Sequence, residues 1–286
     1  MMFRYQGIEF GGDTGSLLVT GFKPGAAEIR GNDTARPNRD GTIAGREFLG
    51  SATWAFDIST NEQDLAEALA TASALEAAWK DPAVRLAPNT LAPLSYETAG
   101  RWRRVYGRPG LYTPPDGDHL TTLGVGRITA DFKVHKPGSY DDAETSVALT
   151  IVPASTGGLM APLVAPLSTV RSSAPRAGFV TNAGDAPTPL KATIHGPITE
   201  PWVRSPEGWE VGLTGSLAYD ESVTVDPLAG TVTRQDGSPA NGRLTRKTRL
   251  SGTLLQPGIT ELTFGGIDLT GTARAVLSWR NAYTSI

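Results

Sequence analysis

Six carboxylates in two groups are the residues best suited to chemistry in this sequence. A pair of acids several ångströms apart can hydrolyse a glycosidic bond, and clustered carboxylate oxygens can bind Ca²⁺. The later group flanks a strand candidate at 222–225, where acidic residues are ordinary turn formers. We therefore interpret the later group as turn residues and expect no hydrolysis of polysaccharides. In chain order they are Asp141, Asp142, Glu144, Asp220, Glu221 and Asp226.

Other catalytic or cofactor-binding arrangements are weaker still. The three histidines, His119, His135 and His195, lie in no spacing that places two imidazoles on one metal ion, and the chain has no cysteine. No Gly-x-Ser-x-Gly turn offers a serine nucleophile. The run 123–126 (LGVG) starts like a dinucleotide fingerprint but lacks the third glycine and a following helix. We predict no catalytic residue, no cofactor and no metal site.

Basic residues interleave with aromatic ones in the segment 101–109 (RWRRVYGRP), a pattern typical of nucleic-acid grooves. A second basic stretch occupies 243–249. The chain as a whole has 26 basic and 29 acidic residues, a formal net charge of −3, which gives no general attraction to phosphate backbones. We therefore interpret Arg103, Arg104 and Arg108 as a face that meets an acidic face of a neighbouring subunit, because arginine binds carboxylates bidentately. We expect no specific nucleic-acid partner.

A third charged segment lies between Lys23 and Gly50. It is too long for a simple hairpin and mixes four arginines with four acids, as expected of a subunit contact. We predict that this segment reaches a neighbouring subunit. Its candidate interface residues are Arg30, Arg36, Arg39, Asp40 and Arg46.

One helix is predicted to support these surfaces, over 61–80. Apolar residues recur there at three- or four-residue spacing and end at Trp79. Ser59 or Thr60 can start it with a capping box, and Asp81-Pro82 ends it. We expect the apolar stripe to be buried against a small sheet. Its members are Leu65, Leu69, Ala72, Leu75 and Trp79.

The rest of the sequence predicts a mainly β fold. From about residue 90, short β-branched or apolar runs alternate with Gly, Pro, Asp and Asn turns. A Pro/Ala-rich stretch, 153–189, is interpreted as a long excursion within the second domain rather than a linker. Strands are expected at 16–22, 52–58, 127–135, 145–152, 191–195, 209–213, 222–225, 231–235, 261–264 and 273–279.

Length and composition agree with about two domains, since 286 residues compare with ~150 per domain. We place the first at 1–138, a β domain with the helix, and the second at 139–286, a purely β sandwich. No run approaches the ~18 apolar residues of a membrane span, and the N-terminus does not read as a secretion signal. We expect a protein without a membrane span.

An ordered set of short segments resembles the distal tail proteins, or minor tail proteins, of long-tailed phages with non-contractile tails. The helix end at Ala78-Trp79 belongs to this set. Each segment is common by itself, and their order along most of the chain carries the resemblance. The others are 36–41 (RPNRDG), 105–109 (VYGRP), 195–201 (HGPITEP), 217–220 (LAYD), 255–258 (LQPG) and 278–283 (SWRNAY).

The resemblance implies a tail-tube-like β domain with one helix, followed by a galectin-like sandwich that points outward. It also implies a virion protein, made in the host cytoplasm, that forms a homo-oligomeric ring of six at the tail tip. The implied partners are the tail tube protein and the tail-tip hub protein, with receptor-binding proteins or a host surface glycan as further candidates. The stretch 153–189 departs from this pattern, since a compact galectin-like domain does not need it.

A carbohydrate-binding or glycan-cleaving sandwich is the competing interpretation. Lectins stack sugars on exposed aromatic rings, and Trp202, Trp209 and Tyr219 could supply one. Solution mass separates the two classes, because a large ring favours the tail protein and a sugar-responsive monomer favours the lectin.

Overall fold

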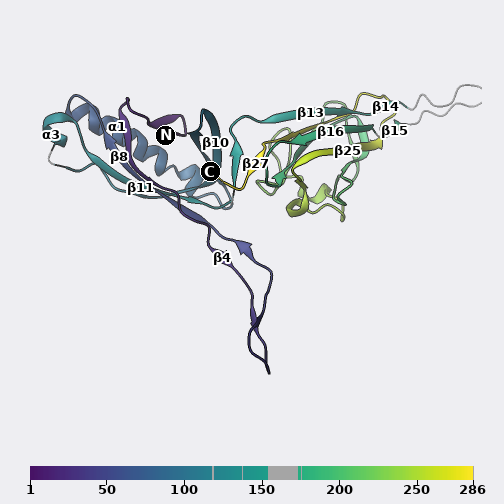
Figure 1. The fold of residues 1–286 in the computed structure, drawn as a ribbon. Helices are drawn as coiled ribbons and strands as arrows, with labels where there is room; N and C mark the ends of the chain where they lie inside the picture. The colour runs from purple at the N-terminus through teal and green to yellow at the C-terminus, as the bar shows by residue number, and fades with distance from the viewer. Residues whose placement is uncertain (118, 137, 154–172, 175, 286) are drawn as a thin grey trace, which may run out of the picture. The chain divides into compact units, whose positions relative to one another are not determined.

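A computed structural model describes residues 1–286 with the exception of 118, 137, 154–172, 175 and 286. The fold is mainly β with one long helix, which confirms the fold class predicted from the sequence. The chain forms two compact units (Figure 1): unit 1 comprises residues 1–142 and 284–286, and unit 2 comprises residues 143–283. The sequence places the boundary after residue 138; in the structure, Ser139–Asp141 forms β12 and pairs with β10 of unit 1.

Unit 1 is built on one antiparallel sheet with the strand order β2-β1-β9-β10-β11-β8-β3, and β12 adds to β10. Burial alternates along β8 and β11, so one face of the sheet is covered and the other is open. The strands are β1 Met2–Tyr5, β2 Ile8–Gly11, β3 Leu17–Lys23, β8 Ala52–Thr60, β9 Ala92–Thr98, β10 Arg101–Tyr112 and β11 Arg127–Val134.

The helix α1 covers the buried face but is shorter than predicted, spanning Leu65–Trp79 rather than 61–80. Asp64 is its N-cap, with a side chain that accepts the backbone N–H of Glu67, so neither Ser59 nor Thr60 starts the helix. Asp81 then caps the short helix α2, Pro82–Arg85, and a further single turn, α3, spans Leu120–Leu123.

The expected apolar stripe of the helix is wrong at Leu69. This side chain is 46% exposed and Leu65 is only partly buried, whereas Leu75 and Trp79 are fully buried. The buried face runs through Ala68, Ala72, Leu75 and Trp79, and Leu69 lies one residue, about 100°, around the helix from Ala68. Small alanines therefore bring the helix backbone close to the sheet.

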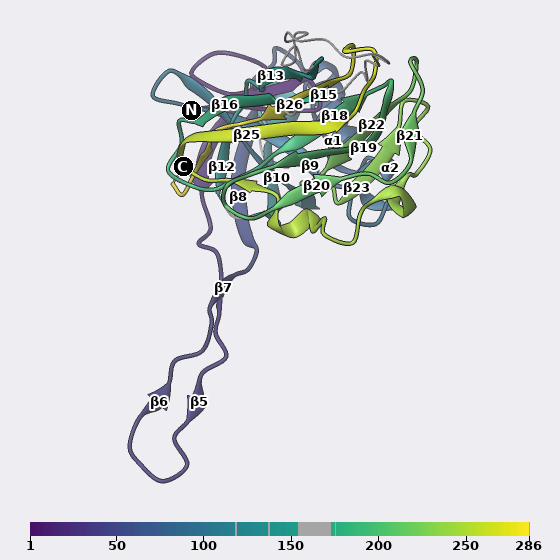
Figure 2. The same ribbon diagram turned by 90° about the vertical axis from the view of Figure 1, so that its right-hand side faces the viewer.

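The segment between β3 and β8 is an arm, residues 24–50, that continues the β3–β8 hairpin away from the sheet (Figure 2). Short antiparallel pairs hold its two sides together: Ile29–Arg30 (β4) pairs with Phe48–Leu49 (β7), and Thr34–Ala35 (β5) pairs with Thr42–Ile43 (β6). The arm is a two-stranded ribbon, which has no second layer to bury its side chains.

Unit 2 is a sandwich of two antiparallel sheets whose inward-facing aliphatic residues form one core. The first sheet has the order β13-β26-β18-β22-β23, with strands Thr145–Thr150, Arg274–Trp279, Lys191–His195, Ser222–Asp226 and Thr231–Arg234. The second has the order β16-β25-β19-β20, with strands Arg176–Asn182, Gly258–Ile267, Ile198–Arg204 and Glu210–Gly212, and β21 (Ser216–Leu217) pairs with β19.

Short elements complete unit 2. They are β14 Val152–Pro153 with β15 Ser173–Ala174, β17 Thr188–Pro189 with β24 Leu254–Leu255, the 3₁₀ turns η1 Asn241–Arg243 and η2 Leu250–Gly252, and β27 Ala282–Tyr283.

The predicted excursion 153–189 needs correction in its second half. Residues 176–182 form β16, which pairs with β25 along its whole length and places Val180 in the core. Alternating burial within the sheet outweighs the Gly- and Ala-rich composition that favoured irregular chain. Residues 154–172 of the excursion lie outside the described residues.

Candidate assembly surfaces

Three of the acids that could serve catalysis or Ca²⁺ binding have partners within unit 2. The Asp226 carboxylate accepts the backbone N–H groups of Leu228 and Ala229 at 2.9 and 3.1 Å, and Glu221 accepts that of Ala218 at 2.9 Å. Glu144 forms an ion pair with Lys191 at 2.8 Å. Within the described residues, no group of three or more His, Asp or Glu side chains could hold a metal ion. Turn hydrogen bonds therefore account for Glu221 and Asp226, whereas Glu144 is held by an ion pair.

The histidines lie on separate elements, two in unit 1 and one in unit 2. His135 Nδ1 lies 2.8 Å from the backbone carbonyl of Lys133, and His119 is the N-cap residue of the helical turn α3. His195 is half-buried on β18, where burial and the positive charge of Arg274 lower its pKa. No helix in the described part of the chain is both long and apolar enough to cross a bilayer.

The arginines at 103–108 bind their own chain. Arg103 donates to the carbonyl of Ser285 at 3.2 Å, and Arg108 donates to the carbonyl of Thr90 at 2.8 Å and to that of Ala87. Arg104 contacts Asp142. The basic-aromatic segment is therefore the strand β10, and the guanidinium groups of Arg103, Arg104 and Arg108 hold neighbouring segments of unit 1.

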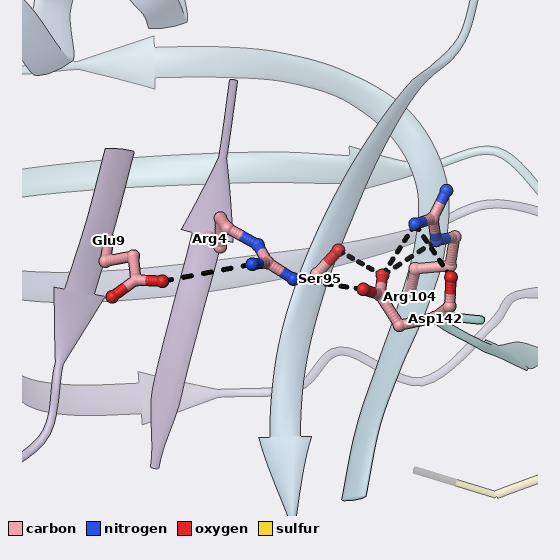
Figure 3. A network of polar contacts seen from close by, with 5 residues as sticks. All are labelled: Arg4, Glu9, Ser95, Arg104 and Asp142. Atoms are coloured by element: carbon pink, nitrogen blue, oxygen red, sulfur yellow. Dashed lines mark hydrogen bonds and ion pairs between the residues drawn. The ribbon is translucent and has the colours of Figure 1, made fainter. Parts of the chain in front are cut away.

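Arg104 belongs to a polar network centred on Asp142 (Figure 3). Arg104 donates through Nε at 2.9 Å and lies 2.7 Å from the same carboxylate through Nη2, while Arg4 reaches the other oxygen at 3.0 Å. Ser95 donates at 2.7 Å, and Arg4 also lies 3.9 Å from Glu9. This Asp142 network joins β1, β2, β9 and β10 to the last residue of the first segment of unit 1.

Two opposing effects act on the ionisation of Asp142. Burial raises its pKa, but the hydrogen bonds from Ser95 and Arg104 and the charges of Arg104 and Arg4 outweigh burial, so the pKa lies below its usual value. The carboxylate is therefore charged at neutral pH and stabilises the two guanidinium groups beside it.

The arm carries the remaining candidate residues, and they are exposed. Arg30, Arg36, Arg39, Asp40 and Arg46 all lie on the surface, and none of the ion pairs found among the described residues involves them. Within the arm, the backbone N–H of Gly45 donates to Asp33 at 2.8 Å, a local contact that shapes the ribbon.

Apolar side chains accompany these charges on the arm, a feature that the sequence analysis missed. Ile29, Ile43, Phe48 and Leu49 are each more than half exposed, at 63%, 55%, 57% and 56%. Ile29 and Leu49 are opposite one another in the β4–β7 pair. Adjacent exposed apolar residues are unusual on a solvated surface and mark contact sites. The apolar runs were visible in the sequence, but they read equally well as buried strand.

The aromatic residues considered for stacking a sugar differ in their surroundings. Trp209 packs against the core of unit 2 and donates its indole N–H to the carbonyl of Leu254 at 2.9 Å, so it serves the fold. Tyr219 is 77% exposed at a turn. Trp202 lies on the second sheet with the guanidinium of Arg204 over its ring, 3.8 Å from the ring centroid.

No family model and no curated protein matches the sequence. Solved structures do match. The crystal structure of the Dit protein of phage SPP1, described as a paradigm of the hub adsorption apparatus in phages that infect Gram-positive bacteria, superposes with a TM-score of 0.58 at 16% identity, covering 97% of each chain. A chain of the phage P2 baseplate in its activated conformation with Ca gives 0.58 at 10% identity, over 100% of this chain and 99% of that one.

The strontium form of the same baseplate gives a TM-score of 0.54 at 12% identity, over 97% of each chain. These likenesses extend through both units and rest on structure, because so few residues are identical. The resemblance to phage distal tail proteins drawn from the sequence is therefore confirmed at the level of the fold, which this chain shares with the SPP1 Dit protein over nearly its whole length.

Proposed function

We propose that this protein is a structural component of a phage tail tip, where it forms a ring of identical subunits, six in number, that joins the tail tube protein to the tail-tip hub protein. The full-length likeness to the SPP1 Dit protein and to a chain of the P2 baseplate supports this role. The proposal places the protein in the virion and includes no catalytic step.

The arm is the observation that carries self-association. An isolated two-stranded ribbon is marginally stable in water, and this one exposes Ile29, Ile43, Phe48 and Leu49. A neighbouring subunit that covers these side chains gains about 25 cal/mol for each Å² of apolar surface removed from water. The equal numbers of arginines and acids on the arm suit a contact between copies of one chain, since each sign finds its opposite on the neighbour.

Each unit has a core of its own, so the two units can serve different roles in the assembly. Unit 1 bears the arm and is the ring-forming part, whereas unit 2 has a complete core of its own and serves as a peripheral module. Receptor-binding proteins are candidate partners of unit 2 under this proposal.

The arm can be tested by charge reversal. Arg36→Glu combined with Arg39→Glu should abolish the ring in native mass spectrometry and negative-stain images, while the circular dichroism and the unfolding midpoint stay as in the parent, because both residues are exposed. A matched control, Arg85→Glu with Arg101→Glu, reverses two exposed arginines of unit 1 outside the arm and should assemble normally. Assembly of the arm variant at the parent's level, or a parent that stays monomeric at every concentration, contradicts the proposal.

A further inference from the structure

A groove with a volume of about 580 Å³ opens on the second sheet of unit 2, in the size range of small-molecule sites. It is lined by residues of β19, β20 and the end of β25 and by the segment that follows η1. Nothing in the proposed ring accounts for it, and its lining combines apolar residues such as Leu213 and Ile267 with Trp202 and five charged side chains.

The floor of the groove is a layered platform. Trp202 lies flat against the backbone of Gly265, where a Cβ would come within 2.3 Å of the indole ring, so the ring position requires glycine there. Arg204 covers the ring with its guanidinium at 3.8 Å from the centroid. Glu210 holds this guanidinium through Nε at 2.6 Å and is itself only 14% exposed, whereas the Arg204 side chain is 47% exposed. The pair fixes Arg204, and the Arg204 side chain lines the groove.

The rim supplies charges of both signs. Arg246 and Lys247 are exposed on one wall, and Glu200 is exposed beside Pro201. Among the described residues, none of these three side chains has an ion pair or hydrogen-bond partner. Glu200 has a backbone φ of +49°, a conformation uncommon outside glycine, at the irregularity where β19 passes β25. Such strained residues cluster at ligand sites.

This donor set fits one kind of ligand. Arg204, Arg246 and Lys247 outnumber the two carboxylates and favour an anionic group. Glu200, by contrast, can only accept hydrogen bonds when ionised, so it suits hydroxyl groups and repels a bare anion. A ligand that joins an anionic group to several hydroxyls satisfies both sides.

We propose that this groove binds an acidic saccharide, a sugar unit that carries a carboxylate or a phosphate group. The anionic group meets Arg246, Lys247 and the outer edge of Arg204, and a ring hydroxyl donates to Glu200. Uronic acid polymers and phosphate-bearing sugars are both ligands of this kind. Each combines an anionic group with hydroxyl groups, so the groove suits either one.

Isothermal titration of the full chain tests the proposal with trigalacturonate and with glucose 6-phosphate, which separate the two sources. The neutral controls are the methyl ester of trigalacturonate and glucose. We expect at least one acidic probe to bind at least about tenfold more tightly than its neutral control, the usual worth of a charge-assisted hydrogen bond. No binding by either acidic probe, or equal binding of the neutral ones, overturns the proposal.

Single substitutions locate the site. Arg246→Gln and Lys247→Gln should each weaken binding about tenfold, whereas Arg249→Gln, which removes the same charge from an exposed residue outside the groove, should leave binding unchanged. Because all three residues are exposed, unfolding midpoints should not change. Equal losses in all three variants indicate general attraction and contradict a built site.

Glu200→Gln separates a saccharide from a simple anion. If a sugar hydroxyl donates to Glu200, the substitution weakens binding of the acidic saccharide. If the groove attracts charge alone, removing this carboxylate strengthens binding, and inorganic phosphate binds as tightly as glucose 6-phosphate. The second result overturns the proposal. The measurement needs only the folded chain and so does not depend on ring formation.

Discussion

The two units bury different kinds of core. Unit 1 fills the space between its single sheet and α1 with aromatic rings, whereas the described core of unit 2 is aliphatic apart from Phe264 and Trp279. The Trp79 ring at the end of α1 meets Tyr5, Phe10, Phe56 and Phe132 with centroid separations of 5.1 to 6.3 Å.

The difference follows from architecture. A helix that presents Ala68 and Ala72 to a sheet approaches closely at that point, and larger rings must fill the space on either side. Two facing sheets about 10 Å apart are filled evenly by Val, Leu and Ile. Unit 1 therefore depends on a few large side chains, and unit 2 depends on many small ones.

The strongest test of this comparison is Trp79→Ala. The side chain is fully buried, contacts four rings and donates its indole N–H to the carbonyl of Asp131 at 3.0 Å. We expect a loss of roughly 3–5 kcal/mol from the free energy of unfolding of unit 1. Calorimetry should show the transition of unit 1 at a lower temperature, and that of unit 2 unchanged.

The matched change in unit 2 is Leu262→Ala on β25, which should cost roughly 2–5 kcal/mol and lower only the other transition. If either substitution lowers both transitions together, the units unfold as one and the comparison between two separate cores is wrong.

A second pair of substitutions sharpens the description of α1. Leu75→Ala removes a fully buried side chain and should cost roughly 2–5 kcal/mol, whereas Leu69→Ala removes one that is 46% exposed and should cost less than about 1 kcal/mol. Urea denaturation of the two variants gives the comparison directly. Equal costs mean that the face of Leu69 is covered, which points to a subunit contact on the helix.

The helix illustrates how far the sequence could predict this fold. Its period identifies the element and the burial of Ala72, Leu75 and Trp79, but it also assigns Leu69 to the buried stripe, because spacing alone does not separate the centre of an apolar stripe from its edge. Strands with alternating burial and β-branched residues, such as β11 and β18, were predicted close to their observed bounds. The helix and these strands could be predicted because the local sequence pattern alone identifies them.

Elements whose residues conflict with local rules were missed. The strand β10 contains Pro109 and two glycines, and β19 contains Pro201, so both read as irregular chain until their neighbours are known. The partners of the candidate interface arginines could not be predicted from the sequence for the same reason. Arg104 is separated from Asp142 by 38 residues, and no local signal distinguishes an arginine with such a partner from the free arginines of the arm.

The partly buried Asp142 and the buried Asp268 extend the comparison to polar groups. Asp142 in unit 1 is held by arginines, whereas Asp268 in unit 2 accepts hydrogen bonds from the backbone N–H and the hydroxyl of Thr270, at 2.8 and 2.6 Å, and from the N–H of Ala273 at 2.8 Å. In both, burial raises the pKa but the hydrogen bonds outweigh it, so the pKa lies below its usual value.

Both carboxylates should therefore make stability depend on pH in the acid range. A lowered folded-state pKa contributes stability that is fully present above the unfolded value, about 3.9, and is lost as the pH falls through the folded pKa. Asp142→Asn and Asp268→Asn should each cost roughly 1–3 kcal/mol at pH 7 and progressively less below pH ~4. A cost that is the same at pH 7 and at pH 2.5 contradicts the assignment of charge to that carboxylate.

The smallest expected difference between the units is in how salt changes the stability that each aspartate contributes. The partners of Asp142 include two guanidinium groups, and Arg4 is 39% exposed on its side chain, so mobile ions screen this network when the Debye length falls from ~10 Å at 0.1 M to ~3 Å at 1 M. The donors to Asp268 that hold the turn before β26 are uncharged backbone and hydroxyl groups, which salt does not screen.

In urea denaturation, the cost of Asp142→Asn should fall by about 0.5 kcal/mol between 0.1 and 1 M NaCl, while that of Asp268→Asn stays constant. Equal salt dependence in both variants means that ion pairing does not distinguish the two units, because the Asp142 network then acts through its hydrogen bonds alone.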